Sequence, residues 1–354
     1  MKKTHHPLSF SFSFSFSFLF FLFLFPFLFS CSNDTTSPAA EEPKPQPTQA
    51  EWAIAIHGGA GHISRESIDS LTAERYASSL ERAISHGILM LENGAESVQV
   101  VEEVIRIMED DSLFNAGKGA VFTSEGRNEL DASIMRGSDK NAGAVTGLTQ
   151  IKNPISAARM VMDSSEHVFF SGEGATQFAL QYDLDTVPPS YFRTAKSWNR
   201  YKKVKERSLV EKEKMGTVGC VVLDKNGDLA AGTSTGGMTW KKHGRIGDSP
   251  MIGAGTYADN ETCAVSCTGH GEYFIRTGVA HEISAQMKHG GKTLEAAAHD
   301  VIHQQLTEMG GTGGIISVDA QGNISLVFNT TGMFRASASS KKPLEVGIFG
   351  DEEE

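Results

Sequence analysis

The chain has 354 residues, a length that suits one large domain or two modest ones with a substantial core. It carries 43 acidic and 32 basic residues, a net charge of −11 at pH 7. Two of the basic residues fall in residues 1–31, which hold no acid, so the rest of the chain is more acidic still. That balance argues against a nucleic acid as a partner.

Residues 1–31 have the pattern of a signal peptide. A basic start is followed by a Ser-Phe alternation and by an apolar run at residues 19–29, which is shorter than the ~20 residues that span a bilayer. The run ends in Leu28-Phe29-Ser30-Cys31, which resembles the lipobox of a bacterial lipoprotein, although Phe29 is unusual there. We therefore expect an exported envelope protein whose only membrane anchor is a lipid on Cys31. An ordinary secretory signal and an uncleaved anchor are the alternatives.

Residues 32–50 are rich in proline, threonine, serine and glutamate and show no apolar periodicity. Such a composition predicts a disordered tether, because it offers too little apolar surface to offset the entropy of ordering. The folded part is therefore expected to begin at residue 51.

The first half of the folded part predicts a strand followed by helices. A short apolar run at residues 53–56 leads into the glycine-rich turn His57-Gly58-Gly59-Ala60-Gly61. Residues 71–92 and 96–110 space their apolar side chains as helices do. Asn153-Pro154 predicts the start of a third helix, since asparagine suits the cap and proline the first turn. We expect these helices to supply core faces only.

A charged segment separates the two halves. Residues 191–215 mix lysine, arginine and glutamate with few apolar residues, which predicts a solvated linker. The segment stops at Gly216-Thr217, and an apolar, β-branched run follows, as when a flexible segment enters a buried strand. A plain turn into that strand is one explanation of the Gly-Thr pair.

The other explanation is chemical. A threonine hydroxyl is a weak nucleophile, and a threonine at the start of a chain has a base in its own α-amine. That amine, with a pKa of about 7.7 to 8.0, can accept the hydroxyl proton near neutral pH. Gly216 suits the same chemistry, because a residue without Cβ leaves its carbonyl open to attack by Thr217. Cleavage of the Gly216-Thr217 bond would create the nucleophile.

Motifs on both sides of this bond resemble, in order and spacing, the plant-type asparaginases. These enzymes are also called isoaspartyl peptidases and belong to the N-terminal nucleophile hydrolases. The resemblance runs from about Trp52 to the C-terminus. Its motifs are His57-Gly58-Gly59-Ala60-Gly61, Leu113-Phe114-Asn115-Ala116-Gly117, Glu129-Leu130-Asp131-Ala132, Gly216-Thr217-Val218-Gly219, Gly232-Thr233-Ser234-Thr235-Gly236-Gly237-Met238, Gly244-Arg245-Ile246-Gly247-Asp248-Ser249-Pro250 and Cys267-Thr268-Gly269-His270-Gly271-Glu272.

The resemblance implies an α+β fold, the four-layer αββα sandwich of N-terminal nucleophile hydrolases. It also implies one domain that self-cleavage divides in two. Residues 51–216 would form the α subunit, with a flexible linker at 192–216, and residues 217–354 would form the β subunit. Two such two-subunit protomers would associate into an (αβ)2 assembly.

For the catalytic groups, the resemblance implies that Thr217 is the nucleophile in self-cleavage and in turnover, and that Thr235 orients it. Thr268 and Gly269 match the pair that stabilises an oxyanion. A phosphate-binding loop is an alternative for the segment around Thr235, but that segment lacks the lysine of such loops.

Arg245 and Asp248 make chemical sense as substrate ligands. A guanidinium can grip an α-carboxylate with two hydrogen bonds and a carboxylate can hold an α-ammonium, so the pair would read the amino-acid end of an aspartyl group. A surface ion pair three residues apart is the plain alternative. In the family's pattern Thr268, Gly269 and Gly271 also contact the substrate.

The resemblance implies no organic cofactor. In the family a loop wraps a structural sodium ion with backbone carbonyls, which suits a hard cation. His299 and His303 imitate half a zinc site, but no third ligand stands out. Gly58 and Asn115 match supporting residues near the nucleophile. The carbonyls that match the sodium loop are those of Glu109, Asp111, Phe114, Ala116 and Lys118.

The implied activity is hydrolysis of β-aspartyl dipeptides and of L-asparagine through a covalent β-aspartyl ester on Thr217, so the partner would be a small molecule or a dipeptide. Glycosylasparaginase, which cleaves a sugar from asparagine, is the nearest alternative, although it typically carries Asp-Thr where this chain has Gly216-Thr217. A non-catalytic surface lipoprotein that keeps the fold is the other alternative.

Overall fold

The structure is a computed structural model that describes residues 49–207 and 216–350. The leader with Cys31, all but the last two residues of the predicted tether, and residues 208–215 of the predicted linker lie outside the described residues. The described residues belong to one compact unit that begins at residue 48.

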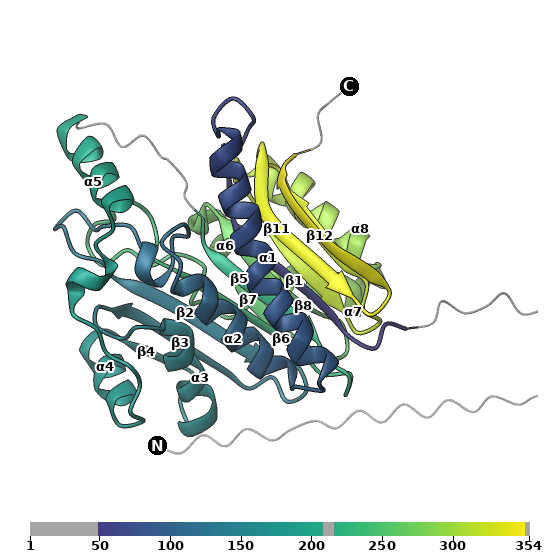
Figure 1. The fold of residues 1–354 in the computed structure, drawn as a ribbon. Coiled ribbons are helices and arrows are strands. Elements are labelled where there is room, and N and C mark those ends of the chain that lie inside the picture. Colours follow the sequence, from purple (N-terminus) through teal and green to yellow (C-terminus); the bar gives the residue numbers. More distant parts are fainter. Residues whose placement is uncertain (1–48, 208–215, 351–354) are drawn as a thin grey trace, which may run out of the picture. The chain divides into compact units, whose positions relative to one another are not determined.

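In the described part of the chain, the strands form two sheets (Figure 1). An eight-stranded sheet has the order β12-β11-β1-β5-β6-β2-β3-β4, and a four-stranded sheet has the order β10-β9-β8-β7. The strands are β1 Ala53–Gly61, β2 Leu130–Arg136, β3 Ala142–Leu148, β4 Phe169–Ser171, β5 Val218–Leu223, β6 Leu229–Thr235, β7 Thr256–Ala258, β8 Cys263–Gly269, β9 Gly313–Asp319, β10 Ile324–Phe328, β11 Gly332–Ser339 and β12 Lys342–Phe349.

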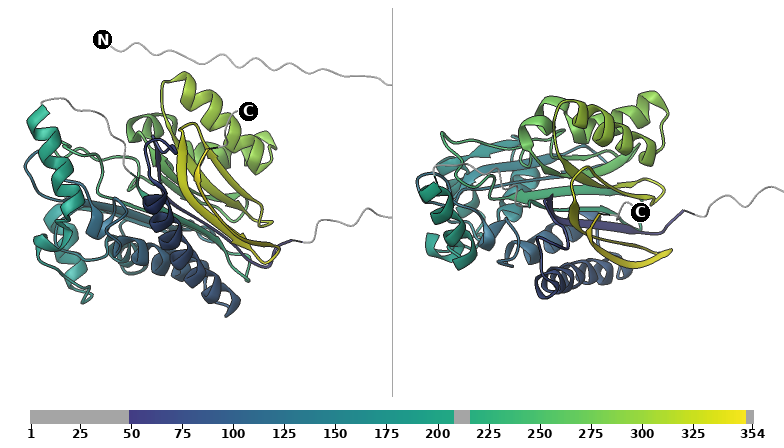
Figure 2. Two further views of the ribbon diagram at one scale, coloured as in Figure 1. Left: turned by 45° about the horizontal axis from the view of Figure 1, so that its top comes forward. Right: turned by 90° about the horizontal axis from the view of Figure 1, so that it is seen from above.

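Helices cover the outer faces of the two sheets, one group on each side (Figure 2). The α-helices are α1 Ser70–Glu92, α2 Ser97–Glu109, α3 Pro154–Ser164, α4 Gly172–Leu180, α5 Ala195–Arg207, α6 Gly271–Thr277, α7 Val279–Gly290 and α8 Leu294–His299. A π-helical turn, Asp300–Leu306, continues α8, and two short 3-10 turns lie at Gly117–Gly119 and Pro189–Phe192.

The alternation of side chains along the strands explains the layers. In β1, Ile54 and Ile56 join the core that the large sheet shares with α1, α2 and α3. Ala53 and Ala55 point the opposite way, into the core between the two sheets, where small side chains let the sheets approach. A third core joins the small sheet to α7 and α8. The predicted α+β fold, a four-layer αββα sandwich, is confirmed.

The predicted helices form where their patterns placed them. Helices α1 and α2 match the predictions at 71–92 and 96–110. Asp69 caps α1 by accepting a hydrogen bond from the Thr72 N–H at 2.8 Å. Helix α3 begins at Pro154 as predicted, but the Asn153 side chain makes no cap bond and donates instead to the Asp110 carboxylate at 3.3 Å.

The two predicted subunits share the large sheet. Strands β1 to β4 precede Thr217, strands β5, β6, β11 and β12 follow it, and the sheet order interleaves the two groups. Strand β1, for example, pairs with β5 on one side and β11 on the other. A cut before Thr217 would therefore leave both parts joined by the same ladders.

The structure differs from the flexible linker predicted at residues 192–216. Residues 195–207 form helix α5. Its Trp198 and Tyr201 stack on each other with ring centroids 5.0 Å apart, and both contact Phe122 of the folded body. The many charges of this segment obscured an aromatic pair three residues apart, which a helix places on one face and can dock.

Candidate active site

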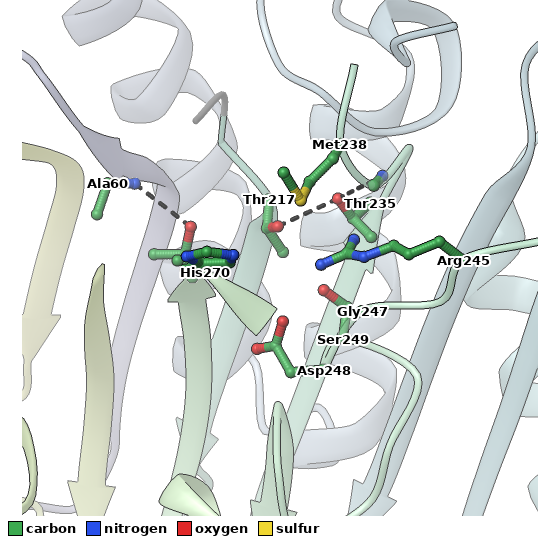
Figure 3. Close-up of a pocket in the computed structure, with 12 residues that line it drawn as sticks. Ala60, Thr217, Thr235, Met238, Arg245, Gly247, Asp248, Ser249 and His270 are labelled. Carbon is green, nitrogen blue, oxygen red and sulfur yellow. Dashed lines mark hydrogen bonds between the residues drawn. The ribbon is translucent and has the colours of Figure 1, made fainter. Parts of the chain in front are cut away.

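Thr217 lies immediately before β5, where the ends of β5, β6 and β8 meet (Figure 3). Its side chain is buried, and its hydroxyl donates to Oγ1 of Thr235 at 3.1 Å. Thr235 is the last residue of β6 and also accepts a hydrogen bond from the Gly237 N–H at 3.1 Å. The structure therefore brings together the two threonines that the sequence paired.

Asn115 holds the loop that follows Thr235. Its amide donates to the Gly237 carbonyl at 2.8 Å, and its own carbonyl oxygen accepts from the Val121 N–H at 3.0 Å. The backbone of Asn115 also accepts from the Gly236 N–H at 3.0 Å. Asn115 thus contacts the turn beside Thr235 and does not contact Thr217 through these bonds.

Thr268 and Gly269 end strand β8 on the opposite side of Thr217. The Thr268 hydroxyl oxygen accepts a hydrogen bond from the Ala60 N–H at 3.3 Å. The segment expected as a glycine-rich turn is the last part of strand β1, with a bulge after His57, and Ala60 lies in it. This bond therefore ties the small sheet to the large one beside the cavity.

Gly216, the residue before Thr217, packs tightly against the glycine-rich end of β1. A Cβ built on Gly216 would lie 2.2 Å from the Gly58 carbonyl oxygen and 2.6 Å from Cα of Gly59. A Cβ on Gly59, whose φ is +116°, would lie 2.1 Å from Cα of Gly216. Only residues without a side chain allow this approach, which fixes the position of the Gly216-Thr217 bond. Gly58 itself packs against Phe114.

Arg245 and Asp248 both reach the cavity, and they do not form the surface ion pair that was the plain alternative for them. The Arg245 guanidinium donates two hydrogen bonds to the Glu272 carboxylate, from Nε and Nη2, both at 2.9 Å. Glu272 lies in the first turn of α6 and is about half exposed. A fork of this kind is the geometry with which an arginine holds a free carboxylate.

Asp248 is buried at 5% exposure, and among the described residues nothing hydrogen-bonds to its Oδ2. Burial raises the pKa of this carboxyl from its ordinary 3.8 to about 7, against smaller opposing effects that include the positive charge of Arg245. Gly271 leaves room for it, since a Cβ there would lie 2.7 Å from Oδ1 of Asp248. A buried carboxylate oxygen to which no described residue donates is suited to a cationic ligand.

These groups line one cavity of about 30 Å³. Figure 3 shows Arg245 and Asp248 approaching it from different sides, with Thr217 between Arg245 and His270. The lining residues are Ala60, Thr217, Thr235, Gly237, Met238, Arg245, Gly247, Asp248, Ser249, Thr268, Gly269 and His270.

The loop between α2 and the 3-10 turn at Gly117–Gly119 is where the sequence predicted a sodium site. A Cβ on Gly119 would lie 2.0 Å from the Phe114 carbonyl oxygen, and a Cβ on Gly117 would lie 2.4 Å from that of Glu109. Carbonyl oxygens thus lie against both glycines, where a side chain would not fit.

The histidine pair sits elsewhere. His299 is the last residue of α8 and His303 lies in the π-helical turn that follows, with their ring centroids 4.6 Å apart. Within residues 49–207 and 216–350, no three or more His, Cys, Asp and Glu side chains converge on a point that could hold a metal ion.

Comparison with known proteins agrees with this geometry. A protein-family model described as "Asparaginase" matches residues 50–348. This chain belongs to that asparaginase family. The predicted family, reached from the motifs around Thr217, is confirmed.

Curated relatives of this asparaginase-family chain carry related names. The isoaspartyl peptidase of Escherichia coli is 46% identical over 306 residues, which cover 84% of this chain and 95% of the relative. The probable isoaspartyl peptidase/L-asparaginase 2 of Arabidopsis thaliana is 42% identical, with 84% and 99% covered. The human isoaspartyl peptidase/L-asparaginase is 39% identical, with 84% and 96% covered. Neither a glycosylasparaginase nor a non-catalytic lipoprotein is favoured by these names.

The predicted location in a bacterial envelope, with a lipid on Cys31, is wrong. Relatives with these enzyme names occur in bacteria, a plant and a human, and none is named as a lipoprotein. The match covers 95% of the Escherichia coli relative, which leaves almost none of it to correspond to the leader of this chain. The lipobox resemblance rested on four residues around one cysteine. None of the helices that the structure describes combines the length and apolar character needed to cross a membrane.

Two residues of the site were quoted in the motifs without a role. Glu272 accepts the hydrogen bonds of the Arg245 guanidinium. The two residues are 27 positions apart, so no local sequence pattern indicates this contact. His57 is fully buried beside Thr217. Its position directly before the glycines that accommodate Gly216 was the available signal.

Proposed function

We propose that this chain is a self-processing amidohydrolase that cleaves β-aspartyl dipeptides and L-asparagine, with Thr217 as its nucleophile. The observation that carries the proposal is the position of Thr217. Its hydroxyl lies in a hydrogen bond to Thr235, inside a cavity that also holds an arginine and a buried carboxylate. The names of the relatives support the same activity.

Self-cleavage comes first. The Thr217 hydroxyl attacks the Gly216 carbonyl carbon, the peptide bond breaks, and the acyl group moves to oxygen as an ester while the α-amine is released. Water then hydrolyses that ester to a Gly216 carboxylate and a free Thr217 hydroxyl. The tight packing of Gly216 on Gly59 holds the reacting bond in one place, which favours an intramolecular step.

In turnover, the free α-amine of Thr217 takes the hydroxyl proton as the oxygen attacks the β-carbonyl of the substrate. The Thr268 hydroxyl and the Gly269 N–H stabilise the oxyanion that forms. The proton passes to the leaving amine, which departs as ammonia or as the α-amino group of the second residue. Water, activated by the same amine, hydrolyses the β-aspartyl ester and releases aspartate.

Asp248 and Arg245 bind the constant part of the substrate. The buried Asp248 carboxylate takes the α-ammonium, and Arg245 takes the α-carboxylate in the fork that it now forms with Glu272. The substrate carboxylate therefore replaces Glu272.

The decisive experiment follows the chain through cleavage. Denaturing gel electrophoresis and intact mass of protein that begins at residue 32 should show two fragments, one starting at Thr217. Thr217→Ala should stay uncut and inactive on asparagine, while the matched Thr217→Ser, which keeps a hydroxyl, should be cut slowly. A wild-type chain that stays whole on long incubation would remove the physical basis of the assignment.

Substrate choice needs a separate assay. Ammonia release from asparagine and aspartate release from a β-aspartyl dipeptide are compared with hydrolysis of an N-acetylglucosaminyl-asparagine analogue. We expect activity on the first two only. Preference for the sugar analogue would point to the glycosylasparaginase alternative.

We also propose a structural sodium ion in the loop at residues 109–119. It would be held by the backbone carbonyls, in agreement with the crowding of carbonyl oxygens around Gly117 and Gly119. Replacement of sodium by a large organic cation should lower the melting temperature, and Gly119→Ala should lower it in either salt. Equal melting in both salts would exclude the ion. The proposed ligands are the carbonyls of Glu109, Asp111, Phe114, Ala116 and Lys118.

For assembly, we propose that two cleaved chains associate into an (αβ)2 particle, as in the family that the motifs resemble. Sedimentation of the cleaved protein should give twice the mass of one chain at micromolar concentration. A single-chain mass across that range would reject the dimer without affecting the proposed chemistry.

A further inference from the structure

His57 is a buried titratable residue that the proposed chemistry does not use. It lies in β1, on the side that faces the small sheet, and is 0% exposed. Its Nδ1 is 3.0 Å from the carbonyl oxygen of Thr217, and its Nε2 is 3.1 Å from Oγ of Ser266 in β8. The ring therefore bridges the backbone of the nucleophile and the second sheet.

The two partners decide which ring nitrogen carries the proton. A carbonyl oxygen only accepts, so Nδ1 must carry hydrogen and donate to Thr217. Burial lowers the pKa of His57 from 6.5 to about 3, in spite of the opposing hydrogen bond to Thr217, so the ring is neutral near pH 7. In a neutral ring Nε2 has no hydrogen, and the Ser266 hydroxyl must donate to it.

A row of hydroxyls lies beside Ser266 and can donate hydrogen bonds toward it. Thr233 lies 2.7 Å from Ser266, Thr256 lies 2.6 Å from Thr233, and Ser133 lies 2.8 Å from Thr256, each measured between side-chain oxygens. Thr256 donates to Thr233, and Thr233 can donate to Ser266, which leaves the Ser266 proton for Nε2 of His57; the Gly255 carbonyl, 3.1 Å from the Thr233 hydroxyl, is the other acceptor within reach of Thr233. Ser133 gives its own proton to the Ser249 carbonyl at 2.6 Å, next to Asp248, and so stands outside this direction of donation.

Gly219 makes space for this contact. A Cβ on Gly219 would lie 2.0 Å from Oγ of Ser266 and 2.3 Å from Nε2 of His57. Real Cβ atoms do not approach other atoms so closely, so any side chain at this position would push the ring and the hydroxyl apart. The glycine two residues after the nucleophile is thus explained by the His57–Ser266 bond.

The Thr217 carbonyl lies just outside the sheet ladders. The pairing of β5 with β6 begins at Val218, and its pairing with β1 begins at Gly219 opposite His57. The His57 side chain therefore fixes the carbonyl of Thr217, the one residue next to β5 that the ladder hydrogen bonds do not reach. Rotation of that peptide would move both the α-amine and the hydroxyl of Thr217, which start from the same Cα.

We propose that His57 is a positioning residue for the nucleophile, held in its Nδ1–H tautomer by the hydroxyls of Ser266, Thr233 and Thr256. It fixes the Thr217 carbonyl, and through it the direction of the Thr217 amine and hydroxyl, without touching the substrate. The inference rests on the proposed function, because it needs Thr217 to be the nucleophile.

Two variants separate the two hydrogen bonds. In His57→Asn the side-chain N–H can occupy the place of Nδ1 and donate to Thr217, while the contact with Ser266 is lost. In His57→Gln the amide reaches the place of Nε2 and leaves the Thr217 carbonyl without its donor. We expect kcat on asparagine to fall about 10- to 100-fold in His57→Gln, with KM within about twofold, and to recover most of that loss in His57→Asn. Self-cleavage should also be slower in His57→Gln than in His57→Asn.

The results are read against wild type measured beside them. An inactive, uncut wild type would reject the proposed function itself. An active wild type with equal kcat losses in both variants, or with losses in KM alone, would reject the positioning role. A solution readout covers the case in which His57→Gln does not fold: in wild-type protein labelled with ¹⁵N histidine, the His57 ring should give the shifts of a neutral Nδ1–H tautomer at pH 7. An Nε2–H or charged ring would overturn the proposal.

Discussion

The two halves of the cavity differ in how far their polar groups are satisfied. On the nucleophile side, Thr217 donates to Thr235 and Thr268 accepts from Ala60, so these hydroxyls are already held without a ligand. On the charged side, Asp248 Oδ2 has no hydrogen bond from any described residue, and Arg245 is engaged by the partly exposed Glu272. The half that would perform the chemistry is organised in advance, and the half that would recognise substrate is left for a ligand to complete.

Removal of the buried charge should damage recognition most. In Asp248→Asn the substrate ammonium meets a neutral amide, and kcat/KM on asparagine should fall about 100- to 1,000-fold, as expected for loss of a buried charge partner. Self-cleavage should continue, because it involves no ammonium ligand. Asp259→Asn is the matched control, since Asp259 is also buried but pairs with Lys140 away from the cavity. Equal losses in both variants would mean that Asp248 acts on stability.

The same carboxyl should set a pH dependence. Its pKa is raised to about 7 in the free protein, so below that pH it is neutral and binds an ammonium poorly. We expect KM on asparagine to rise about tenfold for each pH unit below 7 and to level off above it. The slope should disappear in Asp248→Asn. A wild-type KM that stays flat from pH 5 to 8 would contradict the burial argument.

A change at Glu272 tests whether this residue competes with the substrate for Arg245 or orients Arg245 to bind it. If Glu272 only competes with the substrate carboxylate for Arg245, Glu272→Gln should lower KM, by up to about fivefold for so exposed a pair. The matched Glu261→Gln, another exposed glutamate of the downstream half that pairs with Lys288, should leave KM unchanged. A higher KM in Glu272→Gln would show instead that Glu272 orients the guanidinium.

A smaller effect is expected at Glu109, which is buried and accepts a hydrogen bond from the hydroxyl of Ser234, the residue before Thr235. Burial raises its pKa from 4.5 to about 8, so the folded state keeps a proton that the unfolded state loses above pH 4.5. Stability from this group therefore declines as pH rises from about 4.5 to 8. Glu109→Gln keeps the acceptor for the Ile155 N–H and the Ser234 hydroxyl and cannot ionise.

The melting temperature of Glu109→Gln should exceed that of wild type by a few degrees at pH 9 and match it near pH 5. Glu103→Gln, at a partly exposed position of the same helix, is the control and should show no such trend. Scanning calorimetry across this pH range is the measurement. A larger difference at pH 5 than at pH 9 would mean that Glu109 does not hold its proton in the folded state.

Much of the fold was predictable because it is local. Apolar spacing located α1 and α2, and the break from charged to β-branched residues located the start of β5. The aromatic pair Trp198 and Tyr201 was missed, because a helix with so many charges shows its docking face only when the partner Phe122 is known. The leader motif misled for the opposite reason, since a short local resemblance was taken to decide the location of the whole protein.

The sequence by itself determined the residue types of the site and their order, above all Gly216-Thr217 and the threonines at 235 and 268. The tertiary structure decided which of these groups touch. The pairing of Arg245 with Glu272 and of His57 with Thr217 joins residues 27 and 160 positions apart. Such contacts arise where strands of two sheets end side by side, and no periodicity along the chain records that packing.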